Sequence, residues 1–180
     1  MTREIVRHIF WPKVGEKGEL DLVSVATVFV SSEQPRFPID NVFDGQRGPG
    51  GSCWIAADAG EQTVTLAFAI PQAVREVNVE SEEHARARTQ EMELSISDDG
   101  GKTYQGLTQR EFRFTPYGAT FERESWDISA DAVTHLRLRI APNGTDGGTH
   151  TDQTGHASLT SFVVRSSRTV SGPNSNERRR

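Results

Sequence analysis

The chain has 180 residues, a formal net charge of −5 at pH 7 and a single cysteine, Cys53. This length suits one domain that buries most of its apolar surface, and one cysteine excludes an intrachain disulfide. The negative charge argues against a surface that attracts nucleic acid everywhere. No segment is apolar enough for a signal-peptide core or a membrane span, so we expect a soluble, cytoplasmic chain.

Apolar residues alternate with polar or small ones in short segments, which is the pattern of half-buried β-strands. In the first half of the chain, strands are predicted at 4–11, 23–30, 64–70 and 74–80. Pro71 and Gln72 stand between the last two segments and predict a turn. We therefore expect these two strands to form a hairpin, with Val77 and Val79 pointing inward.

A loop rich in polar residues and glycine lies between 23–30 and 64–70. Asp40, Asn41, Asp44 and Gly45 predict a compact turn, because Asp and Asn side chains bond nearby backbone amides and glycine accepts positive φ. Trp54 follows this loop. Its place in the pattern favours a core position over a platform for a sugar ring.

The second half of the chain continues in the same way. Further strands are predicted at 92–96, 111–115, 120–128, 134–141 and 157–165, and the Asp-Gly sequence after the first of them predicts a tight hairpin. No stretch of ten or more residues has a helical period. The pattern predicts an all-β antiparallel sandwich that forms one domain over 1–165, followed by a disordered tail over 166–180.

Several motifs occur in the order that is typical of one family. They read I-D-N-V-F-D-G before Trp54, then G-E-Q-T-V-T-L-A-F, S-I-S-D-D-G-G-K-T-Y, H-L-R-L-R-I-A-P and A-S-L-T-S-F-V-V. In this the chain resembles the discoidin or coagulation factor V/VIII C-type domain of the galactose-binding-like superfamily. W-I-A-A-D-A-G-E-Q-T-V-T-L also resembles, locally, the N-terminal domain of the X-ray-repair scaffold protein.

The family resemblance implies an antiparallel jelly roll of about eight strands, with ligand-binding loops at one end. Members bind sugars, phospholipid surfaces, proteins or damaged DNA, so the fold alone does not choose among these ligands. Many sugar-binding members hold a structural calcium ion near the Asp-Gly turn, which here implies Asp40 and Asp44. The corresponding acidic ligand on the last strand is replaced by Ser161.

Polar and aromatic loop residues are the candidates for ligand binding. Arginine, glutamate and histidine supply the donors and acceptors that pair with sugar hydroxyls, although a solvated turn of mixed charge explains the same cluster. The candidates are Arg36, Phe37, Glu82, Glu83, His84, Arg86, Arg88 and Tyr117.

Catalysis finds little support in the sequence. It contains no nucleophile elbow, P-loop or H-E-x-x-H motif, and Glu82 and Glu83 are adjacent in sequence rather than placed across a cleft. His150, Asp152 and His156, with Asp146 nearby, match no familiar spacing for a transition-metal site. We expect a chain that is not an enzyme.

The sequence therefore predicts a non-catalytic module that binds carbohydrate through loops at one end of the sandwich. The alternative is an intracellular domain that binds a protein partner or a nucleic-acid end. In that case Arg86, Arg88 and the terminal Arg178, Arg179 and Arg180 would contact phosphates. A membrane-surface function is not expected, because apart from Phe37 and Tyr117 the loops lack exposed apolar residues.

Overall fold

The structure, a computed structural model, describes residues 5–7, 18–143 and 155–166, and the segment predicted as a disordered tail lies almost wholly outside them. The described part is nearly all antiparallel β, as predicted. Its strands are β1 (Ile5–Arg7), β2 (Ala26–Val30), β3 (Trp54–Ala59), β4 (Gln62–Glu82), β5 (Arg88–Ser97), β6 (Gln105–Phe114), β7 (Phe121–Asn143), β8 (His156–Leu159) and β9 (Ser161–Arg165). Two short helical segments, α1 (Leu22–Val25) and the 3-10 helix η1 (Ile39–Phe43), interrupt them.

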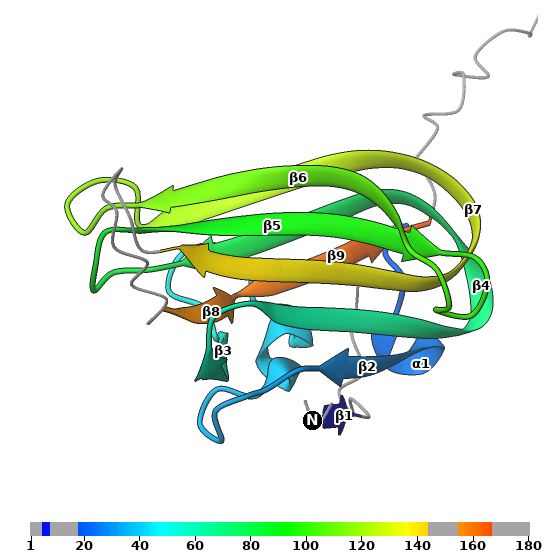
Figure 1. The fold of residues 1–180 in the computed structure, drawn as a ribbon, viewed down its shortest axis with the longest axis horizontal. Helices are drawn as coiled ribbons and strands as arrows, with labels where there is room; N and C mark the ends of the chain where they lie inside the picture. The colour runs from blue at the N-terminus through cyan, green and yellow to red at the C-terminus, as the bar shows by residue number, and fades with distance from the viewer. Residues whose placement is uncertain (1–4, 8–17, 144–154, 167–180) are drawn as a thin grey trace, which may run out of the picture.

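The strands form a sandwich whose two layers share two long strands. The order β1-β2-β4-β7-β5-β6 runs through the larger sheet, β9 pairs with β4, and β3 pairs with β8. The first half of β4 lies beside β2 and its second half beside β9. Both β4 and β7 bend at the right-hand end of Figure 1 and continue into the other layer. The sequence-predicted sandwich is therefore confirmed.

The hairpin expected at Pro71 and Gln72 is wrong. The two halves of β4 do not pair with each other, because both pair with β7 as one strand with shifts of register between Ala67 and Glu76. Such irregularities bend a strand. Proline has no N–H to donate to a regular ladder, so it is tolerated at a position where the ladder is interrupted. Ile70 lies at the bend and is 71% exposed, so it does not share the core face with Leu66.

Other elements also differ from the predictions: β3 was not predicted, and β6 begins at Gln105 and not at 111. Residues 22–25 form a helical turn, in which the N–H of Val25 donates to the carbonyl of Asp21 (3.1 Å). The strands expected at 120–128 and 134–141 are one continuous strand, β7. The strand expected at 157–165 is divided at Thr160, where the chain passes from β8 to β9. Alternation alone does not show whether a strand continues through a bend.

The core lies between the two layers and closes around Trp54. This side chain is fully buried, and its indole Nε1 donates to the carbonyl of Ser32 (3.1 Å), which confirms the predicted core position. Val77 and Val79 are also fully buried, as predicted. Among the described residues, no helix has the length and apolarity that a membrane crossing requires.

Candidate functional site

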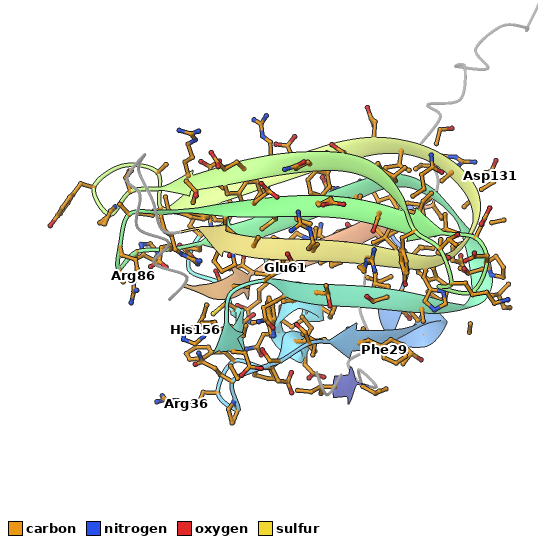
Figure 2. All side chains as sticks on the ribbon, in the orientation of Figure 1. Phe29, Arg36, Glu61, Arg86, Asp131 and His156 are labelled. Carbon is orange, nitrogen blue, oxygen red and sulfur yellow. The ribbon has the colours of Figure 1, made fainter. Side chains whose placement is uncertain are left out.

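A groove of about 390 Å³ opens at the end of the sandwich where β4 leads into β5. Five of the eight sequence-predicted ligand residues line it, which are Glu82, Glu83, His84, Arg86 and Arg88. The other lining residues come from distant parts of the chain and are Gln34, Cys53, Ile55, Ala85, Gly155, His156 and Ser158. Figure 2 shows Arg86 and His156 at this end, to the left of the strands.

Arg88 forms the floor of the groove. Its guanidinium donates to Glu83 Oε2 (2.8 Å), to the carbonyl of His156 (3.0 Å) and to Ser158 Oγ (2.8 Å). Burial lowers the pKa of Arg88, whereas the ion pair with Glu83 raises it. Gln90 completes this network by donating to the carbonyl of Ser158 (2.9 Å). Arg88 therefore joins β5 to β8 and supports the groove from beneath.

The two carboxylates of the groove hold its loops in place. Glu83 accepts from the N–H of Ala85 (2.7 Å) as well as from Arg88, and so orders the turn between β4 and β5. Glu82 accepts from the N–H of Gly50 (2.9 Å) and contacts His84 Nε2 (2.7 Å). Gly50 has a φ of 78°, a conformation that glycine adopts without strain. The glycine-rich loop is thereby fixed to the end of β4.

The rim of the groove is polar and accessible, in contrast to its floor. His84, Arg86 and His156 are exposed, while Gln34 and Ile55 form a partly buried wall. The N–H of Gln34 donates to the carbonyl of Ile55 (2.9 Å), which fixes this wall. The groove thus combines donors and acceptors with one apolar surface.

Cys53 also lines the groove, where its side chain is partly buried. Burial raises its pKa, and the negative charge of Glu82 raises it further. The carbonyl of Cys53 accepts from Asn41 Nδ2 (2.8 Å), so this residue helps to join the Asp-Gly turn to the groove.

Three predicted ligand residues lie outside the groove lining. Arg36 is exposed at the same end (Figure 2), on the turn in which the N–H of Phe37 donates to the carbonyl of Gln34 (2.9 Å). Phe37 is partly buried, and its carbonyl accepts from Ile55. Tyr117 is fully exposed between β6 and β7. The structure therefore brings together the 82–88 cluster but not these three residues.

Sequence reasoning missed Gln34, Ile55 and Ser158 as members of the site. They come from three separate segments, and no spacing in the sequence connects them to 82–88. The sequence pattern places His156 only in the 146–156 group, which matches no familiar metal-site spacing, and positions 146, 150 and 152 lie outside the described residues. Its place at the start of β8, opposite Ala59 of β3, explains how it reaches the groove.

The turn that contains Asp40 and Asp44, where the family resemblance implies calcium, is held by hydrogen bonds of its own. Asp44 accepts from the N–H of Gln46 (2.8 Å) and from the hydroxyl of Ser52, so both of its oxygens stabilise the turn. In the part of the chain that the structure describes, no three His, Cys, Asp or Glu side chains gather as metal ligands do. Calcium takes six or more oxygen ligands, which include backbone carbonyls as well as carboxylates. Calcium binding by this turn stays a prediction.

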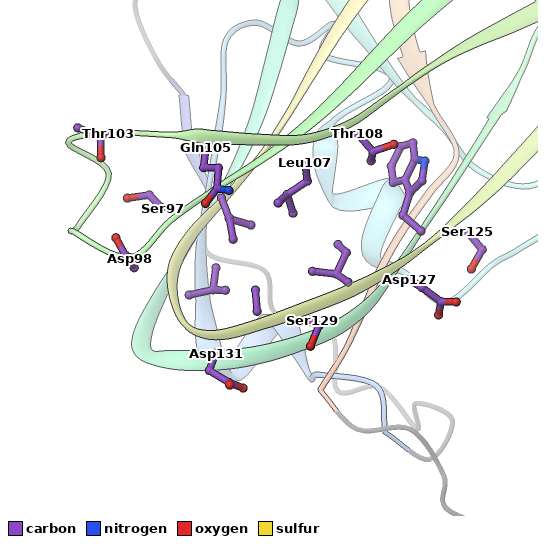
Figure 3. A pocket seen from close by; sticks show the side chains of 15 residues that line it. Ser97, Asp98, Thr103, Gln105, Leu107, Thr108, Ser125, Asp127, Ser129 and Asp131 are labelled. Atoms are coloured by element: carbon purple, nitrogen blue, oxygen red, sulfur yellow. The ribbon is translucent and has the colours of Figure 1, made fainter.

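A larger hollow of about 720 Å³ lies between the β5–β6 hairpin and β7 (Figure 3). It contains none of the sequence-predicted ligand residues. Thr103 and Leu107 line it from the β6 side, and Ser129 and Asp131 from β7. Asp131 forms an ion pair with Arg75 at the bend of β4. We therefore place the candidate site at the groove beside Arg86 and not in this hollow.

The nucleic-acid alternative loses one of its expected phosphate contacts. Arg88 is buried and ion-paired with Glu83, so its charge is not available to a phosphate. The terminal arginines from Arg178 lie outside the described residues. Of the arginines named for this function, only Arg86 is exposed in the structure.

No family model matches this sequence, and no curated protein gives a significant match. Solved structures do share its fold. The chain is similar to CBM32-3 from a family 31 glycoside hydrolase of Clostridium perfringens (TM-score 0.60, 14% identity), over 87% of this chain and 100% of that one. It is similar to CpGH89CBM32-4 of the same organism, in complex with GlcNAc-alpha-1,4-galactose (TM-score 0.55, 13% identity, 84% and 97% covered).

A third similar structure is chitosan-binding module 1 of a chitosanase/glucanase from Paenibacillus sp. IK-5 (TM-score 0.53, 19% identity, 79% and 96% covered). At these identities the likeness shows the fold alone. The fold is therefore the galactose-binding-like β-sandwich that the sequence predicted. The finer resemblance to discoidin domains and the local likeness to the repair scaffold stay predictions.

Proposed function

We propose that this chain is a non-catalytic carbohydrate-binding module whose ligand lies in the loop-end groove. The observation that carries the proposal is the convergence of Gln34, His84 and Arg86 on one accessible groove above a buried, fully bonded Arg88. Support comes from the carbohydrate-binding modules that share the fold, since two of the similar structures are named for a disaccharide or for chitosan.

The groove offers the contacts that sugars need. Neighbouring hydroxyls each donate and accept, and the exposed guanidinium of Arg86 matches them. The His84 ring and the Gln34 amide can add to these contacts with the atoms that their bonds to Glu82 and to the Ala56 carbonyl leave available. Ile55 offers an apolar surface to the C–H groups of a sugar ring. Glu82, Glu83 and Arg88 are held by their own partners, so the residues that support the groove are ordered before the ligand arrives, which lowers the entropic cost of binding.

The same contacts argue against hydrolysis in this groove. Glycosidases use two carboxylates that flank the glycosidic bond, one as an acid and one as a nucleophile or base. Glu82 and Glu83 are consecutive, and each accepts hydrogen bonds from loop amides. Neither is placed across the groove from the other, so we expect binding without turnover.

The proposal is tested by measuring the binding of the natural chain and of the Ala85→Trp variant to a glycan array. Ala85 is exposed in the groove and contributes only its backbone N–H to the Glu83 contact, so a large ring should fill the groove without disturbing its support. Tyr117→Trp is the matched control, because this position is exposed outside the groove. We expect selective binding that Ala85→Trp abolishes and Tyr117→Trp keeps, at unchanged melting temperature.

Two other results would count against this function. Binding that survives Ala85→Trp would place the ligand elsewhere on the domain. An empty array together with salt-sensitive binding of a DNA oligonucleotide would favour the nucleic-acid alternative, because phosphate contacts weaken as counterions compete.

A further inference from the structure

The charges that line the groove are not equally available to a ligand. Two carboxylates, Glu82 and Glu83, stand against two arginines, so the formal charge of the lining is zero with the histidines neutral. The Glu82 and Glu83 side chains are only 10% and 17% exposed. Both already accept hydrogen bonds, Glu82 from Gly50 and Glu83 from Ala85. The negative charges of the groove are therefore recessed and compensated.

The two arginines of the groove differ in exposure, and one of them is available to a ligand. Arg88 is buried, and its guanidinium donates to Glu83, His156 and Ser158. Arg86 is exposed at the rim and makes no hydrogen bond or ion pair with any residue that the structure describes. Arg86 and Arg88 line the same groove, and burial together with the charge of Arg86 lowers the pKa of Arg88. The positive charge that a ligand meets in this groove is that of Arg86.

A second exposed cation lies at the same end of the sandwich as Arg86. Arg36 lies at the same end of the sandwich (Figure 2), two residues from the groove-lining Gln34. It too makes no ion pair within the described part of the chain. Arg36 and Arg86 are therefore two exposed cations at this end of the domain, although the whole chain is acidic with a net charge of −5.

We infer that the ligand is an anionic saccharide, a sugar with a uronate carboxylate, and that this carboxylate pairs with Arg86. The inference rests on the proposed function and specifies the class of sugar. A guanidinium presents a planar fork of donors that matches a carboxylate, and such charge-assisted bonds are about twice as strong as neutral ones. A neutral sugar offers Arg86 only uncharged acceptors, whereas a carboxylate also supplies the opposite charge.

Matched sugars test this inference. We compare galactose with galacturonic acid, glucose with glucuronic acid, and mannose with mannuronic acid, together with the methyl ester of each uronic acid. The ester keeps the size of the sugar and removes its charge. We expect one acid to bind about tenfold more tightly than its neutral partner and its ester, which is the scale of one charged hydrogen bond. This preference should fall as salt is raised.

Substitutions of Arg86 test whether this side chain contacts the carboxylate of the sugar. Arg86→Gln should weaken binding of every sugar and remove the preference for the acid over its neutral partner and its ester, and Arg86→Lys should restore part of that preference. Lys102→Gln is the control, because Lys102 is exposed in the β5–β6 hairpin at the opposite end of the sandwich and its loss changes the net charge equally. Lys102→Gln should keep the full preference.

The outcomes separate this inference from the proposed function. Equal binding of the acid, the ester and the neutral sugar would overturn the inference and leave the carbohydrate function standing, as would a preference that survives Arg86→Gln. A sulfated sugar that binds in an Arg86-dependent way while every uronate fails would overturn the choice of carboxylate. Failure of all sugars, charged and neutral, would overturn both proposals.

Discussion

Arg88 and Glu83 form an ion pair, with 2.8 Å between Nε and Oε2, whose side chains are only 6% and 17% exposed. The pair joins the first residue of β5 to the turn that precedes it. Because Arg88 also donates to β8, the pair determines how the candidate groove is held against the sandwich. Its removal should therefore affect both stability and binding.

Arg88→Met should lower the free energy of unfolding by about 3 kcal/mol, because a broken buried pair leaves Glu83 and Ser158 without their partner. Arg113→Met is the control, since its ion pair with Glu111 is largely exposed and should contribute less than about 0.5 kcal/mol. Urea denaturation measures both values. A loss for Arg88→Met as small as that of the control would show that the buried pair does not stabilise the groove.

Trp54→Ala should destabilise the fold by about 3–5 kcal/mol, the usual cost of removing a large aromatic side chain from a core. Trp54 is fully buried and donates to the carbonyl of Ser32, whereas Tyr117 is fully exposed. Tyr117→Ala should change stability by less than about 0.5 kcal/mol. Thermal and urea unfolding provide the comparison. A stable Trp54→Ala variant that loses sugar binding would instead assign Trp54 to the site.

Asp99 should make the β5–β6 hairpin sensitive to acid. Hydrogen bonds from Ser97 Oγ (2.7 Å), the Thr103 N–H (3.0 Å) and the Thr103 hydroxyl (2.7 Å) lower the pKa of Asp99 well below its ordinary value. Because the folded pKa lies below the unfolded one, the stabilisation is fully present above about pH 4 and is lost as pH falls through the folded pKa.

The difference in stability between the natural chain and Asp99→Asn should therefore shrink between pH 6 and pH 2. Urea denaturation at several pH values measures it, and a carboxyl titration by NMR gives the pKa of Asp99 directly. A difference that stays constant with pH would show that the ionised form of Asp99 is not favoured by the fold.

A chelator should leave the melting temperature unchanged, because both oxygens of Asp44 already accept hydrogen bonds within the turn. Asp44→Ala should lower stability by about 1–2 kcal/mol through loss of the contacts with Gln46 and Ser52. Differential scanning calorimetry with calcium and with chelator tests the first point. A fall in melting temperature that appears only with chelator, and that Asp44→Ala abolishes, would restore calcium to this turn.

Local patterns predicted the parts of the fold that depend on local chemistry. The alternation from Met92 to Ile96 and the Asp-Gly sequence after it predicted β5 and its hairpin with β6, and both are confirmed. The hairpin at Pro71 failed because proline indicates a break in pairing but not whether the chain reverses or bends. The pairing of β4 with β7 on both sides of the bend is a tertiary property.

In the candidate site too, local patterns predicted some residues, and tertiary structure determined the others. Residues 82–88 are contiguous, and their density of charged groups made them visible in the sequence. The structure assigns them different positions, with Arg88 buried, Glu82 and Glu83 recessed and Arg86 exposed. Gln34 and Ile55 reach the groove through a hydrogen bond between two distant segments. No local signal distinguishes a supporting arginine from one that meets the ligand.

Strands β4 and β7 tie the two layers together covalently. Each contributes half of its length to one layer and half to the other, and they remain paired on both sides of the bend. Neither layer can therefore detach while the other stays intact, and we expect amide protons in both layers to exchange with solvent through one common opening. A protease that cuts a surface loop would leave the halves of this domain held together.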